Sequence, residues 1–358
     1  YYATAGFHED LKKAGQIGIS LGLTVLIGYL VYRGVPDWHL AWHVMIQGKP
    51  LWLLTGFLFV MLHMLLRALR WGILLSPVKH GISYRNLFSL TLVKYVLNAI
   101  PPRAGEVAAS VVLARKEKIS VASVIAASLL ERILDMFTVV FIFGFYLSFY
   151  ADRFAPNSDR GREIMGMIQK YSLKGLVGLC LFFGLLAFLL WKDSWLSRLP
   201  HGPQNLLRSF LSGFKGLQKG EVLLKTMVLS LAIWIAITLQ LWSMLHAYLE
   251  IFPFPGALFL MAITVVGVAI PTPGGVGGFQ FFMNLGLVNF FSRYLSEMDP
   301  VSQAAGISNG CYLVSAVPVM ILGLYFLNRE GLTLNRLSKM EAEAGVGDVK
   351  EADPVRES

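Results

Sequence analysis

The sequence predicts an all-α polytopic membrane protein with about six full transmembrane helices and two oppositely oriented, broken re-entrant helix hairpins. Three observations predict this fold class. Hydrophobic residues make up 55% of the 358 residues, charged residues make up only 15%, and the mean hydropathy is +0.60. Apolar runs long enough to cross a bilayer recur along the chain. Two further apolar stretches are interrupted by proline and glycine, which do not continue a helix.

Short polar loops separate the full spans, whose expected ranges are residues 16–32, 51–75, 121–150, 173–191, 222–249 and 301–327. Together, residues 16–327 are expected to form a single transmembrane domain. Residues 1–15 are a polar, cytoplasmic lead-in, and no cleavable signal peptide is evident because no small-residue cleavage site follows the first run. Trp38 and Trp42 lie in a mildly polar stretch before the second span, and tryptophan favours the membrane interface. We expect a surface amphipathic helix within residues 192–219 and a polar, disordered tail over residues 328–358.

Two apolar stretches are broken near their middle. The first joins residues 87–100 to residues 107–113 through Pro101-Pro102-Arg103-Ala104-Gly105-Glu106. The second joins residues 257–270 to residues 281–291 through Pro271-Thr272-Pro273-Gly274-Gly275-Val276-Gly277-Gly278-Phe279-Gln280. Each flanking run is too short to span a bilayer. Backbone groups freed at membrane depth are tolerated only inside protein or against a water-filled cavity, so each stretch is expected to be two half-helices that meet at an internal site.

The placement of lysine and arginine orients the chain, because cytoplasmic loops carry an excess of these residues. With both termini in the cytoplasm, most loop cations lie inside, and the 151–171 loop is the one basic loop outside. The first hairpin then enters from the cytoplasmic side and the second from the outer side. The order span, hairpin, span occurs twice in opposite orientation, over about residues 51–150 and 222–327. Such inverted repeats are typical of secondary transporters, with the substrate site near mid-membrane.

Ionisable residues fall inside the expected spans, where charge is costly and therefore indicates a functional site. Two groups share a helical face by their spacing, namely His63, Arg67 and Arg70 in the second span and Glu131 and Asp135, beside Arg132, in the third. Arg67 precedes the end of its span by eight residues, roughly 12 Å at 1.5 Å per residue. Lys94, Arg103 and Glu106 reach a similar depth if the first hairpin ends near the midplane.

Two interpretations of these charges remain open. In the structural one, Arg67 or Arg70 pairs with Asp135, and Arg103 pairs with Glu131 or Glu106, so that the pairs hold helices together. In the functional one, the basic residues outnumber the acidic ones because they bind an anion, and arginine binds phosphate through two parallel hydrogen bonds.

The glycine-rich tract has two interpretations as well. A half-helix that begins near Gly277 or Gly278 would point backbone N–H groups and a positive dipole end at the gap, which also favours an anion. Alternatively, the glycines only allow close helix packing. The candidate substrate-binding residues are Arg67, Arg70, Lys94, Asn98, Arg103, Gly105, Glu106, Glu131, Arg132, Asp135, Pro273, Gly274, Gly275, Gly277 and Gln280.

Motifs of several other protein classes are missing from the sequence. It contains no zinc-protease, serine-hydrolase or nucleotide-binding motif, and its two cysteines, Cys180 and Cys311, lie in apolar runs without metal-ligand spacing. We therefore expect no catalytic residues, no metal and no cofactor. The net charge of +9 resides in short loops that set topology and contact anionic headgroups, so no nucleic-acid partner is expected.

The motifs resemble those of a known family when they are taken together and in order. They are Leu69-Arg70-Trp71, then Asn98-x-x-Pro101-x-Arg103-x-Gly105-Glu106, then Glu131-Arg132-x-x-Asp135, then Pro271-x-Pro273-Gly274-Gly275-x-Gly277. This pattern, over roughly residues 17–327, is similar to the lysylphosphatidylglycerol synthase transmembrane, or flippase-like, family. Pro102 departs from the pattern, since the family more often has a small residue there.

The resemblance implies an integral membrane protein that flips lipids between the leaflets of a bacterial or archaeal cytoplasmic membrane. In the bifunctional synthases a separate soluble domain attaches the amino acid, and with about thirty residues after the last span a stand-alone member is expected here. Stand-alone members are associated with other lipids, so the substrate does not carry over.

The function expected from these observations is a transporter that flips an anionic phospholipid or lipid-linked headgroup through a cavity between the two hairpins. Its expected partners are membrane lipids. The alternatives that remain open are a membrane-embedded enzyme acting on a lipid headgroup, with Glu131 or Asp135 as base, and a non-transporting scaffold for a lipid-modifying enzyme. A lipid-synthesising partner enzyme and a homo-oligomer are open as well.

Overall fold

The structure is a computed structural model that describes residues 18, 22, 24–98, 104–150, 159, 161–167, 170, 220–296 and 298–330. Helices account for nearly all of these residues, and no strand occurs in the part of the chain that is described. The expectation of an all-α membrane protein is confirmed. The predicted fourth span, the 192–219 connector, Cys180 and the 331–358 tail lie outside these residues, and the first span is described continuously only from Thr24, where a helix runs to Gly34.

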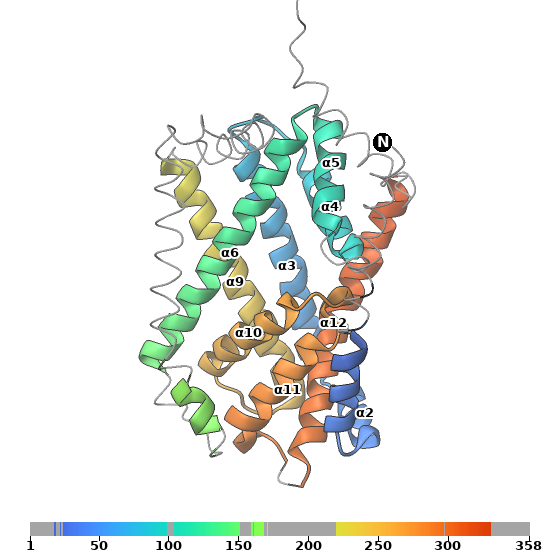
Figure 1. Cartoon of the computed structure of the whole chain (residues 1–358), viewed down its shortest axis with the longest axis vertical. Helices are drawn as coiled ribbons and strands as arrows, with labels where there is room; N and C mark the ends of the chain where they lie inside the picture. Colours follow the sequence, from blue (N-terminus) through green and yellow to red (C-terminus); the bar gives the residue numbers. More distant parts are fainter. Residues whose placement is uncertain are drawn as a thin grey trace, which may run out of the picture.

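Four long helices run along the molecule and form its frame (Figure 1). They are α3 (Pro50–Leu75), α6 (Val121–Phe149), α9 (Gly220–Tyr248) and α12 (Pro300–Arg329). Each begins and ends within two residues of its predicted span. Among the described helices, α3, α9 and α12 are long and apolar enough to cross a membrane. The 29 residues of α6 reach about 43 Å, which is also long enough, but three charged side chains interrupt its apolar surface.

Two pairs of shorter helices lie at opposite ends of this frame (Figure 1). The first pair is α4 (Tyr84–Leu97) and α5 (Ala104–Glu117). The second is α10 (Phe254–Ala269) and α11 (Gly278–Phe290), joined through the short 3₁₀ turn η2 (Pro273–Gly275). Both pairs turn back near the middle of the molecule. The sequence therefore locates both broken stretches. The second interruption falls at Pro273 and the glycines after it, and the first lies between Leu97 and Ala104, where residues 99–103 are outside the described part of the chain.

Helix α4 begins before the apolar run predicted at residues 87–100, because residues 84–86 form its first turn. Ser83 is extended and caps the helix, and its carbonyl accepts from the Leu87 N–H. The Tyr84 hydroxyl donates to the carbonyl of Leu65 on α3 at 2.9 Å. This contact anchors the start of α4 to the frame.

The helix contacts of the first half have counterparts in the second. Helix α3 packs against α9, α4 against α12, and α10 against α6. The contacts of α3 with α4 and of α5 with α6 correspond to those of α9 with α10 and of α11 with α12. The contacts of α3 with α6 and of α6 with α9 correspond in the same way to those of α9 with α12 and of α12 with α3. If α3, α4, α5 and α6 are exchanged for α9, α10, α11 and α12 in that order, this set of contacts stays the same.

Glycines set the closest helix approaches. In the second hairpin, Gly267 on α10 and Gly278 on α11 meet backbone to backbone, and a Cβ on either would overlap the carbonyl of the other. On α12, a Cβ at Gly306 would overlap the Ala41 carbonyl of α2 (Trp38–Ile46), and one at Gly323 would meet α4. The interpretation that glycines allow close packing therefore applies to these positions.

Two apolar clusters fill the interior, and each belongs mainly to one half. One surrounds Trp71 and is built from α3, α4, α5 and α6. The larger one centres on α9–α12 and contains the ring contact of Phe259 with Phe290, whose centroids are 4.7 Å apart. Tyr146 and Phe143 of α6 reach into this second cluster and contact Phe259. Helix α6 thus connects the two halves.

A polar contact that depends on pH lies where the start of α4 meets the end of α5. Lys79 Nζ and Asn86 Nδ2 donate to the Glu117 carboxylate at 2.7 and 2.8 Å. Burial alone would raise the pKa of Glu117, but these hydrogen bonds and the charge of Lys79 lower it below its ordinary value. A lowered folded-state pKa means that the contact stabilises the fold above the ordinary glutamate pKa and loses this effect as pH falls through the folded-state pKa.

We therefore expect Glu117→Gln to lower the melting temperature near neutral pH. The difference between the two proteins should shrink as pH falls from neutral through the folded-state pKa, because the wild-type carboxylate then becomes protonated. Thermal unfolding of both proteins in detergent across this range measures it. An unchanged difference between the two proteins at acid pH would contradict the assignment.

Candidate functional site

The centre of the candidate site is Asp135 on α6, which accepts hydrogen bonds from two other helices. Arg67 Nη1 and Arg70 Nη1 of α3 donate to its two oxygens at 3.0 and 2.8 Å. Trp234 Nε1 of α9 donates to the Arg70-bound oxygen at 3.1 Å, and Arg70 also donates to the Ser230 hydroxyl at 2.8 Å. The pairing of Arg67 and Arg70 with Asp135 is one that the spacing predicts. The buried carboxylate joins α3, α6 and α9.

Glu131 lies one turn earlier on α6 and faces the first hairpin. Lys94 of α4 donates to it at 3.3 Å, and Arg70 Nη2 lies 3.8 Å away. Lys94 also stands over the ring of Trp71, 4.2 Å from its centroid, in a cation–π contact. Lys94 and Glu131 are both buried. The alternative in which Arg103 pairs with Glu131 or Glu106 stays a prediction, because residues 99–103 lie outside the described part of the chain.

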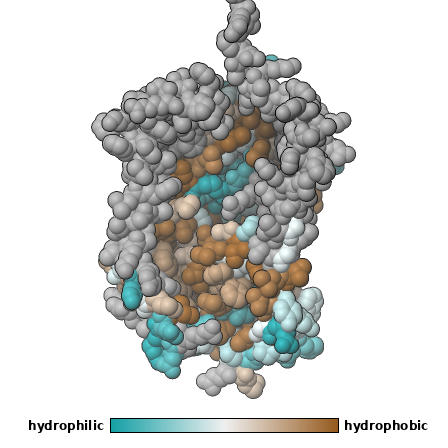
Figure 2. All heavy atoms as spheres, viewed as in Figure 1, coloured by the Kyte–Doolittle hydropathy of each residue, from teal (hydrophilic) through white to brown (hydrophobic). Residues whose placement is uncertain are grey.

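A second ion pair lies at the surface beside this cluster. Arg132 of α6 donates to Glu106 of α5. The Arg132 side chain is 48% exposed, and its neighbours Leu129, Met136 and Val107 are exposed apolar residues. Figure 2 shows a hollow on this face, between α6 and the first hairpin, where hydrophilic residues are surrounded by hydrophobic ones. A charged pair is therefore accessible at a depth where the surface is otherwise apolar.

The charged cluster contains hydrogen-bond donors that have no acceptor among the described residues. Four cations, Arg67, Arg70, Lys94 and Arg132, face three carboxylates, Glu106, Glu131 and Asp135. Within the described residues, the buried Nε atoms of Arg67 and Arg70 and the Nη2 atom of Arg70 have no hydrogen-bond partner. A buried donor left without an acceptor costs about 1–3 kcal/mol, more when charged. The site is therefore suited to accept an additional anion or water.

A small cavity opens at these donors. It has a volume of about 20 Å³, roughly the space of one water molecule, and is lined by Arg67, Lys94, Glu131, Arg132 and Asp135 together with Thr91 and Tyr95. The side chains close over most of the space between them. A headgroup would enter only if the helices around this cavity separate.

Asn98 and Gly105 stand where the first hairpin turns back. Asn98 caps α4, and its N–H donates to the Lys94 carbonyl at 3.0 Å. A Cβ at Gly105 would overlap this same Lys94 carbonyl, so Gly105 lets α5 approach the end of α4. The contacts of both residues are structural, and they fix the turn from which Lys94 points at Glu131.

The glycine-rich tract forms the turn of the second hairpin. Gly274, Gly275 and Gly277 have φ angles of 63°, 74° and 84°, a conformation that side chains with a Cβ rarely adopt. Pro273 opens η2, the Tyr312 hydroxyl donates to the Gly274 carbonyl at 2.8 Å, and Gln280 accepts the Gly277 N–H at 2.8 Å. Helix α11 begins at Gly278, as predicted, but the Gly277 N–H points to Gln280.

The structure brings together part of the predicted site. Arg67, Arg70, Lys94, Glu131 and Asp135 form one cluster, with Arg132 and Glu106 beside it. No hydrogen bond or ion pair among the described residues joins this cluster to the glycine-rich tract, which contacts α12 and, at Gly277, the helix around Ile27. The first hairpin contributes charged side chains to the candidate site, and the second hairpin contributes irregular backbone.

Sequence reasoning missed three residues of the cluster, namely Ser230 and Trp234 of α9 and the cation–π partner Trp71. The only available signal for the first two is their i, i+4 spacing, which puts two hydrogen-bonding side chains on one face of an apolar span. Gln240, farther along α9, donates to Ser315 of α12 at 2.7 Å, which is an interhelical contact.

Two kinds of chemistry fit such a cluster, binding of an anion and transfer of a proton. Arginine and lysine side chains held in place by carboxylates are preorganised donors for phosphate. Among the described residues, no group of three or more His, Cys, Asp and Glu side chains could hold a metal ion.

Comparison with individually curated proteins gives no match. Comparison with family descriptions gives one, over residues 16–297, which contains both hairpins and the whole charged cluster and ends before α12. A match to most of the 358 residues shows the family. The chain belongs to the family described as Lysylphosphatidylglycerol synthase TM region, and it is a multi-pass membrane protein linked by that membership to lipid handling.

Proposed function

We propose that this protein is a transporter that moves an anionic phospholipid or lipid-linked headgroup between the leaflets of a bacterial or archaeal cytoplasmic membrane, without chemically changing it. The observation that carries the proposal is the buried cluster around Asp135, in which cations outnumber carboxylates and several arginine N–H groups have no hydrogen-bond partner among the described residues. Ionisable groups at membrane depth are costly and mark transport pathways in many membrane proteins. An anionic headgroup would supply the missing acceptors.

The paired contacts of the two halves support an inverted repeat. Each contact among α3–α6 has its counterpart among α9–α12, and the two hairpins enter the frame from opposite ends (Figure 1). In transporters built from inverted repeats, the two halves exchange roles as the site opens first to one side and then to the other. We propose that the hairpins are re-entrant and that their turns gate the charged cluster from the two sides of the membrane.

The distribution of charge supports an orientation with the first hairpin opening toward the cytoplasm. Its end of the molecule holds Lys79, Arg85, Arg115, Lys116, Lys118 and Arg329. The described residues at the other end include Arg33, Lys49 and Arg293, and the described part of the 151–171 loop adds Arg162 and Lys170. The acidic residues Asp37, Asp159, Glu163, Glu250 and Asp299 lie at this end as well. Because cytoplasmic loops carry the excess of basic residues, this distribution supports a cytoplasmic C-terminal end of α12.

The exposed Arg132–Glu106 pair supports lateral entry of the lipid. It lies between α5 and α6 and is surrounded by exposed apolar side chains, so an acyl chain can stay in the bilayer while the headgroup meets the charges. Among the four cations of the site, Arg132 has the most exposed side chain. We propose that it makes the first contact with the headgroup and that Lys94 and Arg67 receive it next.

Translocation in proteoliposomes tests the proposal. The purified protein should accelerate movement of headgroup-labelled phosphatidylglycerol between leaflets, with zwitterionic phosphatidylcholine as the control lipid. We expect Lys94→Gln to slow this movement by at least about tenfold, since a hydrogen bond to a charged group contributes about 1.5–3 kcal/mol and 1.4 kcal/mol is a factor of ten. Lys94→Arg keeps the charge and should retain most of the rate.

The matched control is Lys225→Gln, which removes a cation from the exposed pair with Glu221 at the start of α9. It should leave the rate unchanged. Equal rates for wild type and Lys94→Gln, in a preparation where wild type is active, would refute the site. Chemical alteration of the lipid by the purified protein would instead establish the membrane-enzyme alternative.

A further inference from the structure

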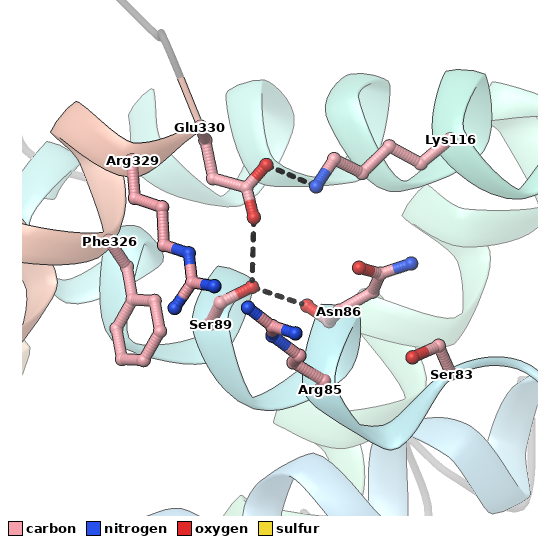
Figure 3. Close-up of a pocket in the computed structure, with 8 residues that line it drawn as sticks. All are labelled: Ser83, Arg85, Asn86, Ser89, Lys116, Phe326, Arg329 and Glu330. Carbon is pink, nitrogen blue, oxygen red and sulfur yellow. Dashed lines mark hydrogen bonds and ion pairs between the residues drawn. The ribbon is translucent and has the colours of Figure 1, made fainter.

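A separate pocket of about 340 Å³ lies where the start of α4 and the end of α5 meet the end of α12 (Figure 3). Three basic side chains line it, one from each helix: Arg85 from α4, Lys116 from α5 and Arg329 from α12. Asn86 and Ser89 supply polar groups from α4, and Glu330 supplies the one carboxylate. Three cations against one carboxylate leave an excess of two positive charges.

The guanidinium groups of Arg85 and Arg329 are both available to a ligand. Neither has a hydrogen bond or ion pair to any residue that the structure describes. Figure 3 shows both guanidinium groups on the pocket side of their helices, in the neighbourhood of Ser89. Both side chains are exposed, and together they offer an incoming anion several donors from two helices, because arginine has donors and no acceptor.

Glu330 shows where the anion would interact. Its carboxylate accepts from Lys116 of α5 and, at 3.4 Å, from the Ser89 hydroxyl of α4, which also donates to the Asn86 carbonyl at 3.1 Å (Figure 3). A carboxylate offers two oxygens, whereas a phosphate offers three and carries more charge. A phosphate in the middle of the pocket would engage the two arginines that Glu330 leaves without a partner.

We propose that this pocket binds a phosphate group, either on a lipid headgroup or as a free anion, and that Glu330 is the internal competitor that the phosphate displaces from Lys116. The volume lies at the lower end of the range for small-ligand sites, which suits a headgroup rather than a whole lipid. The pocket shares no residue with the cluster around Asp135. Binding here does not depend on the proposed translocation, and the two are tested separately.

Binding measurements on the full chain test this proposal, with phosphatidic acid and phosphatidylcholine in nanodiscs as lipid probes and inorganic phosphate as the free probe. We expect Arg85→Gln combined with Arg329→Gln to weaken binding of phosphatidic acid or of inorganic phosphate by at least about tenfold. Lys225→Gln, which removes a cation elsewhere at the same end, should leave the affinity unchanged.

Glu330→Gln gives the opposite and more selective result. Removing the internal carboxylate takes a like charge out of the pocket and frees Lys116, so binding should become roughly fivefold tighter. A gain in affinity does not arise from misfolding, and it keeps the test valid if the arginine variants are unstable.

The pattern of binding separates the two sources of phosphate. Binding of phosphatidic acid that inorganic phosphate does not displace assigns the pocket to a lipid headgroup, and displacement at similar concentrations assigns it to a free anion. Affinities that are the same in wild type, the double arginine variant and Glu330→Gln overturn the proposal. An equal loss in Lys225→Gln overturns it too, because it shows attraction to net charge alone.

Discussion

Gly278→Ala is expected to disrupt the second hairpin and to lower the free energy of unfolding by about 3 kcal/mol, the upper end of the range for overpacking. A Cβ at this position would overlap the carbonyl of Gly267 on α10. The obstacle is backbone, which has no rotamer to change, so α10 and α11 would have to separate. The melting temperature and the fraction of monodisperse protein in size-exclusion chromatography measure the effect.

The control for this substitution is Gly144→Ala on α6, where a new Cβ would meet nothing within 4 Å. Alanine has a higher helix propensity than glycine by about 1 kcal/mol, so this variant should be as stable as wild type or slightly more stable. If both variants behave alike, the close approach of α10 and α11 is not what requires glycine at position 278.

Asp135→Asn is expected to destabilise the protein by about 3–5 kcal/mol, the range found when one partner of a buried ion pair is removed. Asparagine keeps the shape of the side chain but removes the charge that compensates Arg67 and Arg70. Two guanidinium groups would then remain in a buried site with a neutral partner. Unfolding of the detergent-solubilised protein, followed by tryptophan fluorescence, measures the loss.

A second substitution separates this charge effect from simple loss of packing. Adding Arg67→Gln to Asp135→Asn removes one uncompensated cation, so the double variant should regain part of the lost stability. Glu221→Gln in the exposed pair with Lys225 is the control and should leave the melting temperature unchanged. Additive losses in the double variant would show that Arg67 and Asp135 do not depend on each other.

The sequence predicts the helices of this protein better than it predicts their charge pairs. Length and hydropathy place the long helices within two residues, and prolines and glycines locate both hairpin turns, because these features depend on local backbone chemistry. The start of α4 differs because it rests on a tertiary contact, the hydrogen bond of Tyr84 to Leu65. Local sequence contains no signal for that contact.

The partners of the charged residues depend on which helices pack together. Glu131 has several cations at comparable depth in the sequence, and the choice of Lys94 follows from the packing of α4 against α3, where Trp71 supports the ammonium group. The contribution of Trp234 to Asp135 requires α9 to lie beside α3 and α6. That arrangement is a property of the whole fold, so spacing along one helix could identify the charges but not all of their partners.

The contacts of α12 impose an order on biosynthesis. Gly323 on this last helix receives the backbone of α4 at Leu92, and the two positions are separated by 231 residues of sequence. At about 5–20 residues per second, the first hairpin therefore waits on the order of ten to fifty seconds for its neighbour to be made. A nascent chain arrested at residue 297, where the family match ends, should show the α4 surface open to modification, and one that includes Arg329 should show it protected.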